Sequence, residues 1–225
     1  MELFNDKLRD FSGLAPIFPI PNLVFFPKTF LPLHIFEPRY LKMLIDAESN
    51  EKIICMTLLE EGYEDDYEGS PSIHKVGSLG YMELNNDNED GTSNILLSGL
   101  AKVSINEIPS KKDFRLAELN IISESQGEED TDILKAKVFR GFERMSTRKG
   151  FPQIPKQFQK AIDFEMAVNF LASHLPINIE QKQKMLELDD ISLRAKILVQ
   201  FMESGTRIED IGGLGSIIPG DPRLN

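Results

Sequence analysis

The sequence feature that most constrains the fold is the proline-rich stretch Ile17–Tyr40, which reads IFPIPNLVFFPKTFLPLHIFEPRY. Within it, Leu31–Phe36 alternates between two sets of side chains with the period of a β-strand. Pro38 follows, and a proline is favoured in the first turn of a helix because its missing N–H would have no partner there. Apolar spacing continues that helix to about Ala47. The stretch therefore predicts the strands that begin a small β-barrel, followed by one helix.

The other apolar run of this stretch is Ile17–Phe26, which is also strand-like. Pro19 and Pro21 each remove a backbone donor, and prolines in strands are confined to edges or bulges. We therefore expect this run to form an edge strand of the barrel.

Apolar segments of strand length follow one another along the next part of the chain, separated by polar turns. The expected strands are Lys52–Leu59, His74–Leu84, Asn94–Ser98, Leu100–Ile108 and Phe114–Ser123, the third and fourth being separated at Gly99. Glu60–Gly69 is acidic and is predicted to be a solvated loop, whereas Asn85–Ser93 is predicted to be a turn. This succession of short strands predicts a barrel or a sandwich.

The composition changes at Ser123–Thr131, a polar and acidic segment without a large apolar residue. We place a domain boundary there, between a β-barrel over residues 1–123 and a helical bundle over residues 124–205. The expected helices cover residues 132–147, a short segment from Pro155, and three segments capped by Asp163, by Asn178 and by Asp189 or Asp190. Residues 206–225 lack periodicity and are expected to be a mobile tail.

The charge balance argues against polyanionic partners. The 225 residues carry 36 acidic and 25 basic side chains, a net charge of −11, whereas nucleic acids and anionic membranes select clustered Lys and Arg. A single cysteine excludes an intramolecular disulfide and favours a reducing compartment. No apolar run is long enough to span a bilayer, and the first residues lack the pattern of a signal peptide. The expected location is the cytoplasm.

No arrangement of residues typical of catalysis or of metal binding occurs in the chain. G-x-S-x-G, G-x-x-x-x-G-K-[ST], H-E-x-x-H and C-x-x-C are all absent. His34, His74 and His174 are far apart, and Cys55 lies in an apolar run that suppresses its thiolate. We therefore expect no catalytic residue, no cofactor and no metal.

Aromatic residues are concentrated in the opening stretch, where Phe25, Phe26, Phe30, Phe36 and Tyr40 lie close in sequence. One interpretation places them in the core and at the seam between barrel and helix. The other interpretation is that some of them line an exposed groove for apolar segments of another protein, because exposed apolar patches mark interaction sites. The residues alone leave both interpretations open.

The chain resembles a known family at several places. FPIPNLVFFP at Phe18–Pro27 and LPLHIFEPRY at Leu31–Tyr40 are similar to the opening of the Lon protease N-terminal, substrate-binding domain. VGSLG at Val76–Gly80, LSGLAKVSI at Leu97–Ile105 and KQKMLE at Lys182–Glu187 resemble later motifs of that domain. The resemblance covers roughly residues 14–204.

Two residues depart from the family pattern. Lys28 stands where the family usually has glycine, so the turn after Pro27 is expected to differ locally. Lys102 stands where arginine is usual, and lysine keeps the charge but lacks the planar fork that makes bidentate contacts.

The resemblance implies an α+β fold, a PUA-like β pseudo-barrel with one inserted helix followed by a C-terminal helical bundle. It also implies a non-enzymatic protein-binding module, because the ATPase and Ser–Lys peptidase modules of the protease have no counterpart here. The implied partners are polypeptides that are unfolded, carry a degron or have a regulatory role. A further implied partner is a protease or other protein machine, for which the module would be an adaptor. The candidate protein-binding residues are Phe25, Phe30, Phe36, Arg39, Tyr40 and Lys102.

A second hypothesis remains beside this one, since PUA-like barrels also bind small molecules or RNA. Its basic patch on the barrel would be made of Lys75, Lys102, Lys111, Lys112 and Arg115. The simpler interpretation of these residues is solvated charge on strands and turns.

Overall fold

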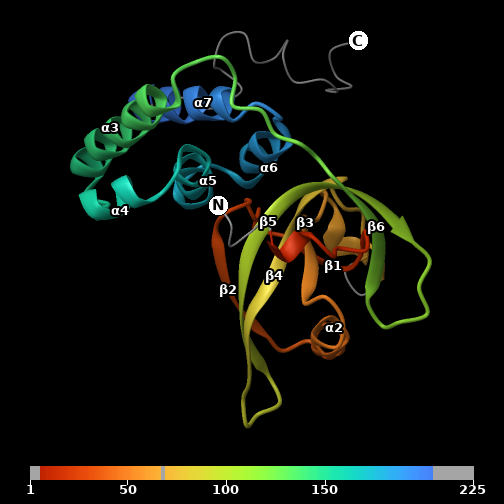
Figure 1. The fold of residues 1–225 in the computed structure, drawn as a ribbon. Coiled ribbons are helices and arrows are strands. Elements are labelled where there is room, and N and C mark those ends of the chain that lie inside the picture. Colours follow the sequence, from red (N-terminus) through yellow and green to blue (C-terminus); the bar gives the residue numbers. More distant parts are fainter. Residues whose placement is uncertain (1–5, 67–68, 205–225) are drawn as a thin grey trace. The chain divides into compact units, whose positions relative to one another are not determined.

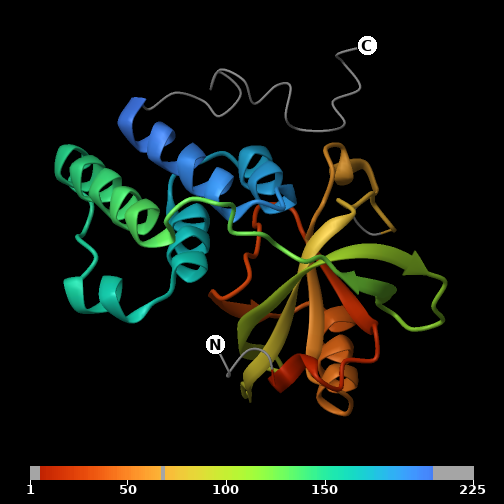
Figure 2. The ribbon, with the colours of Figure 1, turned by 45° about the horizontal axis from the view of Figure 1, so that its top comes forward.

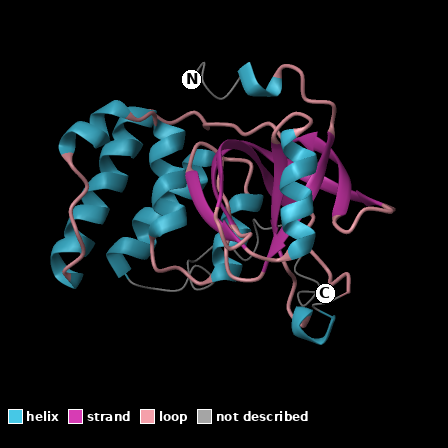
Figure 3. Cartoon of the chain, turned by 90° about the horizontal axis from the view of Figure 1, so that it is seen from below, coloured by secondary structure: helices cyan, strands magenta, loops and turns pink. Residues whose placement is uncertain are grey.

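The structure is a computed structural model, which describes residues 6–66 and 69–204. The chain divides into two compact units, Met1–Ser123 and Glu124–Asn225. In Figure 3 the strands gather in the first unit together with one long helix, whereas the second unit is made of helices. The fold class is therefore α+β, as predicted. The tail expected over residues 206–225 lies outside the described residues.

The first unit is a six-stranded sheet that closes on itself (Figure 1). After a short 3-10 turn, η1 (Asp6–Leu8), its strands are β1 (Leu14–Ile20), β2 (Phe30–Ile35), β3 (Ile53–Leu58), β4 (Val76–Asp87), β5 (Ser93–Ile108) and β6 (Arg115–Ile121). Their order is β2-β5-β4-β3-β1-β6, and β5 also pairs with β6. That last pairing closes a ring of five strands and leaves β2 as a flanking strand. The acidic loop contains a second 3-10 turn, η2 (Tyr63–Asp66).

Strand β1 is not the edge strand that its prolines predicted. It lies between β3 and β6, but Leu14–Ile17 pairs with β6 and Ile17–Ile20 with β3. The Gly13 carbonyl accepts a hydrogen bond from Leu119 N–H of β6, and the Ile20 carbonyl accepts one from Leu59 N–H beside β3. The backbone N–H and C=O groups of odd-numbered residues in β1 therefore point to β6, and those of even-numbered residues point to β3. Pro16 thus faces β3 before that pairing begins, and Pro19 faces β6 after that pairing has ended. Each proline lies where no ladder donor is needed, which is why an interior strand tolerates both.

Strand β5 is one continuous strand of 16 residues, so the predicted break at Gly99 is wrong. Gly99 instead permits a close crossing, because a Cβ there would lie 2.5 Å from the carbonyl oxygen of Phe26. Lys28 N–H donates to the Gly99 carbonyl and Gly99 N–H donates to the Thr29 carbonyl, both at 2.8 Å. Through these two hydrogen bonds, Gly99 connects β5 to the segment of chain that precedes β2. The predicted turn at 85–93 is also shorter than expected, since β4 continues to Asp87.

Helix α2 (Pro38–Glu48) begins at the predicted proline and closes the core of the barrel. It buries Tyr40, Met43, Leu44 and Ala47 in a cluster that also contains apolar residues of β1 to β5. Every residue of β3 is buried, as the continuous apolar run predicted.

The second unit consists of α3 (Thr131–Lys149), α4 (Lys156–Ala161), α5 (Phe164–His174), α6 (Ile179–Glu187) and α7 (Ile191–Ser204). Figure 2 shows α3 and α7 side by side. The predicted caps are present, since Asp163 accepts from Met166 N–H at 2.8 Å and Asn178 from Gln181 N–H at 2.7 Å. Gly150 ends α3 in the left-handed conformation, at a φ of 73°.

Candidate functional site

The first candidate surface is the β2 edge, defined as Phe30–Phe36. In the described part of the chain β2 stands at one end of the strand order and pairs with β5. Phe30 is 52% exposed and Phe36 is 65% exposed, although both are large apolar residues. An exposed strand edge flanked by apolar side chains is a template for another strand.

The direction of the backbone along the β2 edge follows from its hydrogen bonds. The Thr29 carbonyl accepts from Gly99 N–H, and the register continues without a shift to Ile35. Odd-numbered residues therefore direct their backbone groups to β5, and Pro32 and His34 direct theirs to the outer side. Pro32 has no donor to offer, so the His34 N–H is the outward donor in the middle of this edge, beside the outward carbonyl groups.

Side chains along β2 divide between the core and the surface. Ile35 is buried, Leu31 and Leu33 are partly buried against the same core cluster, and Pro32 and His34 are exposed. His34 Nδ1 lies 2.9 Å from Asn94 Oδ1, and its ring lies 6.4 Å from that of Phe36. The alternation predicted for Leu31–Phe36 is thus confirmed, and its outward set forms the candidate surface.

The outer face next to β2 is also apolar. Pro32 is opposite Leu96 on β5, and Leu96 is opposite Leu84 on β4, which is 54% exposed. Paired residues on adjacent strands share one face of a sheet. The apolar surface therefore extends from the β2 edge onto the β4–β5 hairpin.

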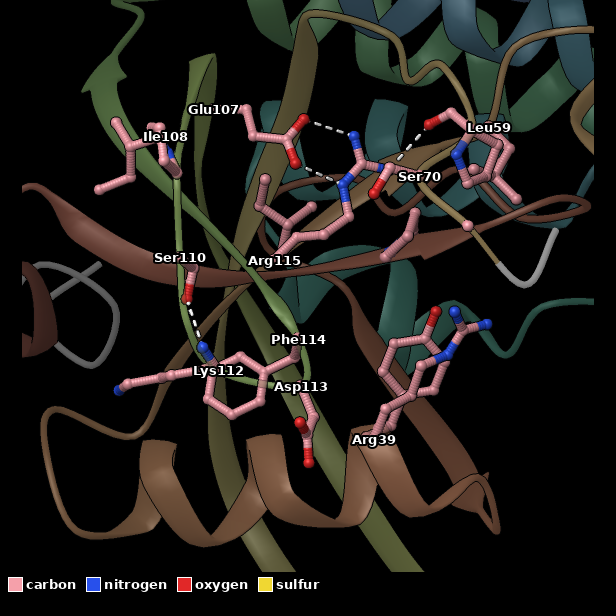
Figure 4. A pocket seen from close by; sticks show the side chains of 16 residues that line it. Arg39, Leu59, Ser70, Glu107, Ile108, Ser110, Lys112, Asp113, Phe114 and Arg115 are labelled. Carbon is pink, nitrogen blue, oxygen red and sulfur yellow. Dashed lines mark hydrogen bonds and ion pairs between the residues drawn. The ribbon is translucent and has the colours of Figure 1, made fainter. Parts of the chain in front are cut away.

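The second candidate site is a pocket of about 280 Å³ between the start of α2 and the β5–β6 connection (Figure 4). Tyr40 and Phe114 contribute aromatic rings to its wall. The Arg39 guanidinium lies 4.8 Å from the centre of the Tyr40 ring, and its Nη2 lies 2.9 Å from Glu37 Oε2. The helix start thus brings a paired cation to the mouth of the pocket.

A bidentate ion pair forms another wall of this pocket. Arg115 Nε lies 2.6 Å from Glu107 Oε1, Arg115 Nη2 lies 2.5 Å from Glu107 Oε2, and Nη1 donates to the Pro71 carbonyl at 2.8 Å (Figure 4). The hydrogen bonds from Arg115 are the main reason that the pKa of Glu107 is lowered, against the opposing effect of burial. Glu107 is opposite Ala117 in the β5–β6 pairing, so Arg115 is its diagonal neighbour on the hairpin, two residues away. Long side chains reach across such diagonals, and opposite charges at these two positions are the sequence signal for the pair.

The six predicted binding residues do not form one site. Phe25 and Tyr40 belong to the core of the barrel, and Lys102 is 1% exposed in the middle of β5. Packing encloses Phe25 and Lys102 in this structure, whereas Tyr40 also lines the pocket beside α2. Phe30 and Phe36 lie on the β2 edge, and Arg39 lies at the pocket.

Three of the five residues considered for a basic patch on the barrel are buried or paired with a carboxylate. Lys102 is buried, Arg115 is paired with Glu107, and Lys112 forms an ion pair with Asp46. Buried or neutralised cations contribute little to the positive surface that phosphate backbones require.

Within residues 6–66 and 69–204, no group of three or more His, Cys, Asp or Glu side chains could hold a metal ion. Cys55 is fully buried in β3, and that burial raises the pKa of its thiol far above the ordinary range. It is a core residue, as the apolar run around it indicated.

Among the helices that the structure describes, none is long and apolar enough to cross a membrane.

Comparison with known proteins gives a consistent result. A family model described as the ATP-dependent protease La (LON) substrate-binding domain matches residues 15–204. Lon protease of Rhizobium meliloti is 26% identical over 195 residues, which are 85% of this chain and 24% of that protein. Lon protease of Cytophaga hutchinsonii is 26% identical over 209 residues, which are 90% of this chain and 26% of that protein. The chain thus spans about a quarter of the length of the curated relatives that it matches.

Two solved structures share the fold. The N-terminal domain of Mycobacterium avium complex Lon protease has a TM-score of 0.67 at 12% identity, covering 86% of this chain and 100% of that one. A Lon N-terminal domain protein from Xanthomonas campestris has a TM-score of 0.61 at 19% identity, covering 84% and 98%. Identities this low support the fold alone.

Proposed function

The chain belongs to the ATP-dependent protease La (LON) substrate-binding domain family, and we propose that it is a non-catalytic module that captures extended, apolar polypeptide segments. The segment would pair with the β2 edge as an added strand. Phe30 and Phe36 would contact its apolar side chains. The observation that carries this proposal is an edge strand whose two ends present exposed phenylalanines.

Strand addition fits the chemistry of this edge. Main-chain hydrogen bonds supply affinity that is independent of the sequence of the segment, and apolar contacts select segments that a folded protein would bury. Phe30 and Phe36 are six residues apart, so a segment of about six residues, roughly 20 Å long, would reach both. This requirement favours unfolded or degron-bearing polypeptides over folded ones.

The expected affinity is modest. Complete burial of a phenylalanine side chain contributes about 1.5–3 kcal/mol, and association costs about 4–15 kcal/mol. Two phenylalanines and a few main-chain hydrogen bonds therefore support dissociation constants in the micromolar range or weaker. Such complexes suit a module that samples substrates and passes them to a larger protein machine in the cytoplasm.

RNA or small-molecule binding by the barrel is less well supported. The pocket beside α2 is near the lower limit of ligand-site volumes, about 300 Å³. Arg39, Lys112 and Arg115 at that pocket are each engaged by a carboxylate.

Fluorescence anisotropy with a labelled, reduced and alkylated model protein tests the proposal. His34→Pro removes an outward donor without changing the bonds to β5, and His34→Ala removes the same contact to Asn94 but keeps the donor. We expect His34→Pro to weaken binding about threefold to tenfold relative to His34→Ala, because a net hydrogen bond contributes about 0.5–1.5 kcal/mol. Equal affinities of the two variants would exclude strand addition.

A second pair of variants tests the apolar contacts. Phe30→Ser together with Phe36→Ser should abolish measurable binding, whereas Ile121→Ser, at a similarly exposed apolar residue of β6, should not change it. Circular dichroism and thermal unfolding establish that each variant is folded. If the Ile121 variant loses as much affinity as the double variant, binding is not localised on the β2 edge.

A further inference from the structure

Positive charge is concentrated in one part of the helical unit, although the chain as a whole is acidic. Residues 131–161, which form α3, α4 and their connection, carry eight basic and two acidic side chains. The basic residues are Lys135, Lys137, Arg140, Arg144, Arg148, Lys149, Lys156 and Lys160, and the acidic ones are Asp132 and Glu143. This segment therefore has a net charge of +6 in a chain whose net charge is −11.

An apolar groove lies within the same segment and the helix that follows it. Its volume is about 650 Å³, and its walls come from α3, the connection to α4, α4 itself and the end of α5. The lining residues include the phenylalanines Phe142, Phe151, Phe158 and Phe170, together with Ile154 and Leu171. Phe158 and Phe170 have ring centroids 5.3 Å apart, and Phe170 stacks on His174 at 4.3 Å.

The apolar character of this groove is not that of a closed core. Phe151 is 39% exposed and Phe158 is 38% exposed. Among the residues that line the groove, no side chain is acidic and none is a lysine or arginine. Contiguous exposed apolar surface of this kind usually marks an interaction site.

Basic residues border the groove rather than line it. α4 contributes Phe158 to the groove and turns Lys156 and Lys160 to a second hollow of about 450 Å³. That second hollow is also lined by Lys135 and Arg140, with Asp132 and Glu143. Lys149 stands seven residues after Phe142 on α3, so the two share one face of the helix. Lys149 and Lys160 are exposed, and neither forms an ion pair with a residue that the structure describes.

We propose that the groove between α3, α4 and α5 is a second docking site, and that its occupant is an acidic segment of a partner protein that carries large apolar side chains. The apolar side chains would enter the groove, and an Asp or Glu residue beside them would face Lys149, which shares the face of α3 that carries Phe142. A lining without Lys or Arg does not suit a phosphate backbone, and a concave groove suits side chains better than a flat lipid surface does. This site is independent of the β2 edge.

The test uses the full chain and a labelled synthetic peptide in which Asp and Glu are interspersed with Phe and Leu. One comparison peptide replaces Asp and Glu with Asn and Gln, and another replaces Phe and Leu with Ser. We expect the acidic apolar peptide to bind at least tenfold more tightly than either, and raised salt to weaken its binding because charge attraction is screened. Equal binding of the acidic and neutral peptides would overturn the proposal, as would tighter binding of single-stranded RNA or of anionic lipid vesicles.

Variants then locate the peptide. Lys149→Glu should weaken binding about fivefold. Lys137→Glu, on the other side of α3 from Phe142, and Lys160→Glu, on the other side of α4 from Phe158, should each leave it within twofold. Phe151→Ser, at an exposed position, should weaken binding about fivefold without unfolding the protein. His34→Pro should leave this affinity unchanged, so a failure here and a failure at the β2 edge are distinguishable. If the Lys149 variant binds as tightly as the Lys137 and Lys160 variants, the peptide is not held in this groove.

Discussion

Arg194 Nη2 donates to Glu124 Oε1 at 2.6 Å, and the two side chains are 0% and 9% exposed. Arg194 Nε also donates to the Met185 carbonyl at 2.8 Å, and Nη1 donates to Asn169 Oδ1 at 2.6 Å. One guanidinium on α7 thus contacts the first residue of the helical unit, α5 and the end of α6. It organises the bundle around a buried, hydrogen-bonded charge.

Replacing Arg194 should destabilise the bundle strongly. Arg194→Lys cannot reproduce the planar set of donors, and Arg194→Met leaves the Glu124 carboxylate buried without its counter-ion. We expect Arg194→Met to lower the free energy of unfolding by about 3–5 kcal/mol, as measured by urea denaturation followed by circular dichroism. Lys196→Met is the control, because the Lys196–Glu129 pair is about half exposed and should cost less than about 1 kcal/mol. Similar losses in both variants would show that burial of the Arg194 pair has no energetic consequence.

The Glu107–Arg115 pair should make the stability of the barrel depend on acid pH. Because the folded-state pKa of Glu107 is lowered, the pair stabilises above the unfolded-state value of about 4.3, and this stability is lost as pH falls through the folded-state pKa. Glu107→Gln should therefore lower the unfolding free energy at pH 7 by about 1 kcal/mol or less, since the pair is partly exposed. The difference between the two proteins should shrink toward low pH in denaturation curves. A difference that stays constant from neutral to low pH would contradict the assignment.

Lys28 adopts the left-handed conformation, at a φ of 57°, in the position where the family usually has glycine. A residue with a Cβ is strained in this conformation by about 1–2 kcal/mol, and glycine relieves that strain. Glycine also raises the conformational entropy of the unfolded chain, which offsets part of the stabilisation. We expect Lys28→Gly to raise the unfolding free energy by up to about 1 kcal/mol. Lys28→Ala, which keeps the Cβ, should leave it unchanged, and a destabilised glycine variant would show that the lysine side chain itself stabilises this turn.

Cys55 should be unreactive in the folded protein. Its complete burial in β3 and the raised pKa of its thiol both suppress the thiolate that attacks disulfide reagents. A colorimetric thiol assay near pH 8 should detect no free thiol under native conditions and one per chain in denaturant. Rapid labelling without denaturant would reveal local opening of the central strand.

Local patterns were sufficient for much of this fold. The alternation of Leu31–Phe36, the proline at the start of α2 and the side-chain caps Asp163 and Asn178 are all confirmed, because each depends on residues close in sequence. The edge position expected for the strand with Pro19 is wrong, since β1 changes neighbours at Ile17 and only the register shows this.

The candidate sites were less predictable. Exposure of Phe30 and Phe36 and burial of Phe25, Tyr40 and Lys102 depend on which residues the closed sheet encloses, and aromatic content does not separate the two groups. The role of Arg194 could not be predicted from the sequence either, because its partners Glu124 and Asn169 are distant along the chain. The binding roles of all six candidate residues remain predictions.

The change of partner along β1 also determines when the barrel can form during synthesis. Leu14 pairs with Glu118, so the strand at the beginning of the chain waits for about 100 further residues before its second neighbour exists. At about 5–20 residues per second, a ribosome takes roughly 5–20 s to make them. During that interval β1 is apolar and incompletely paired, and the nascent chain is itself the kind of polypeptide that we propose the finished barrel recognises.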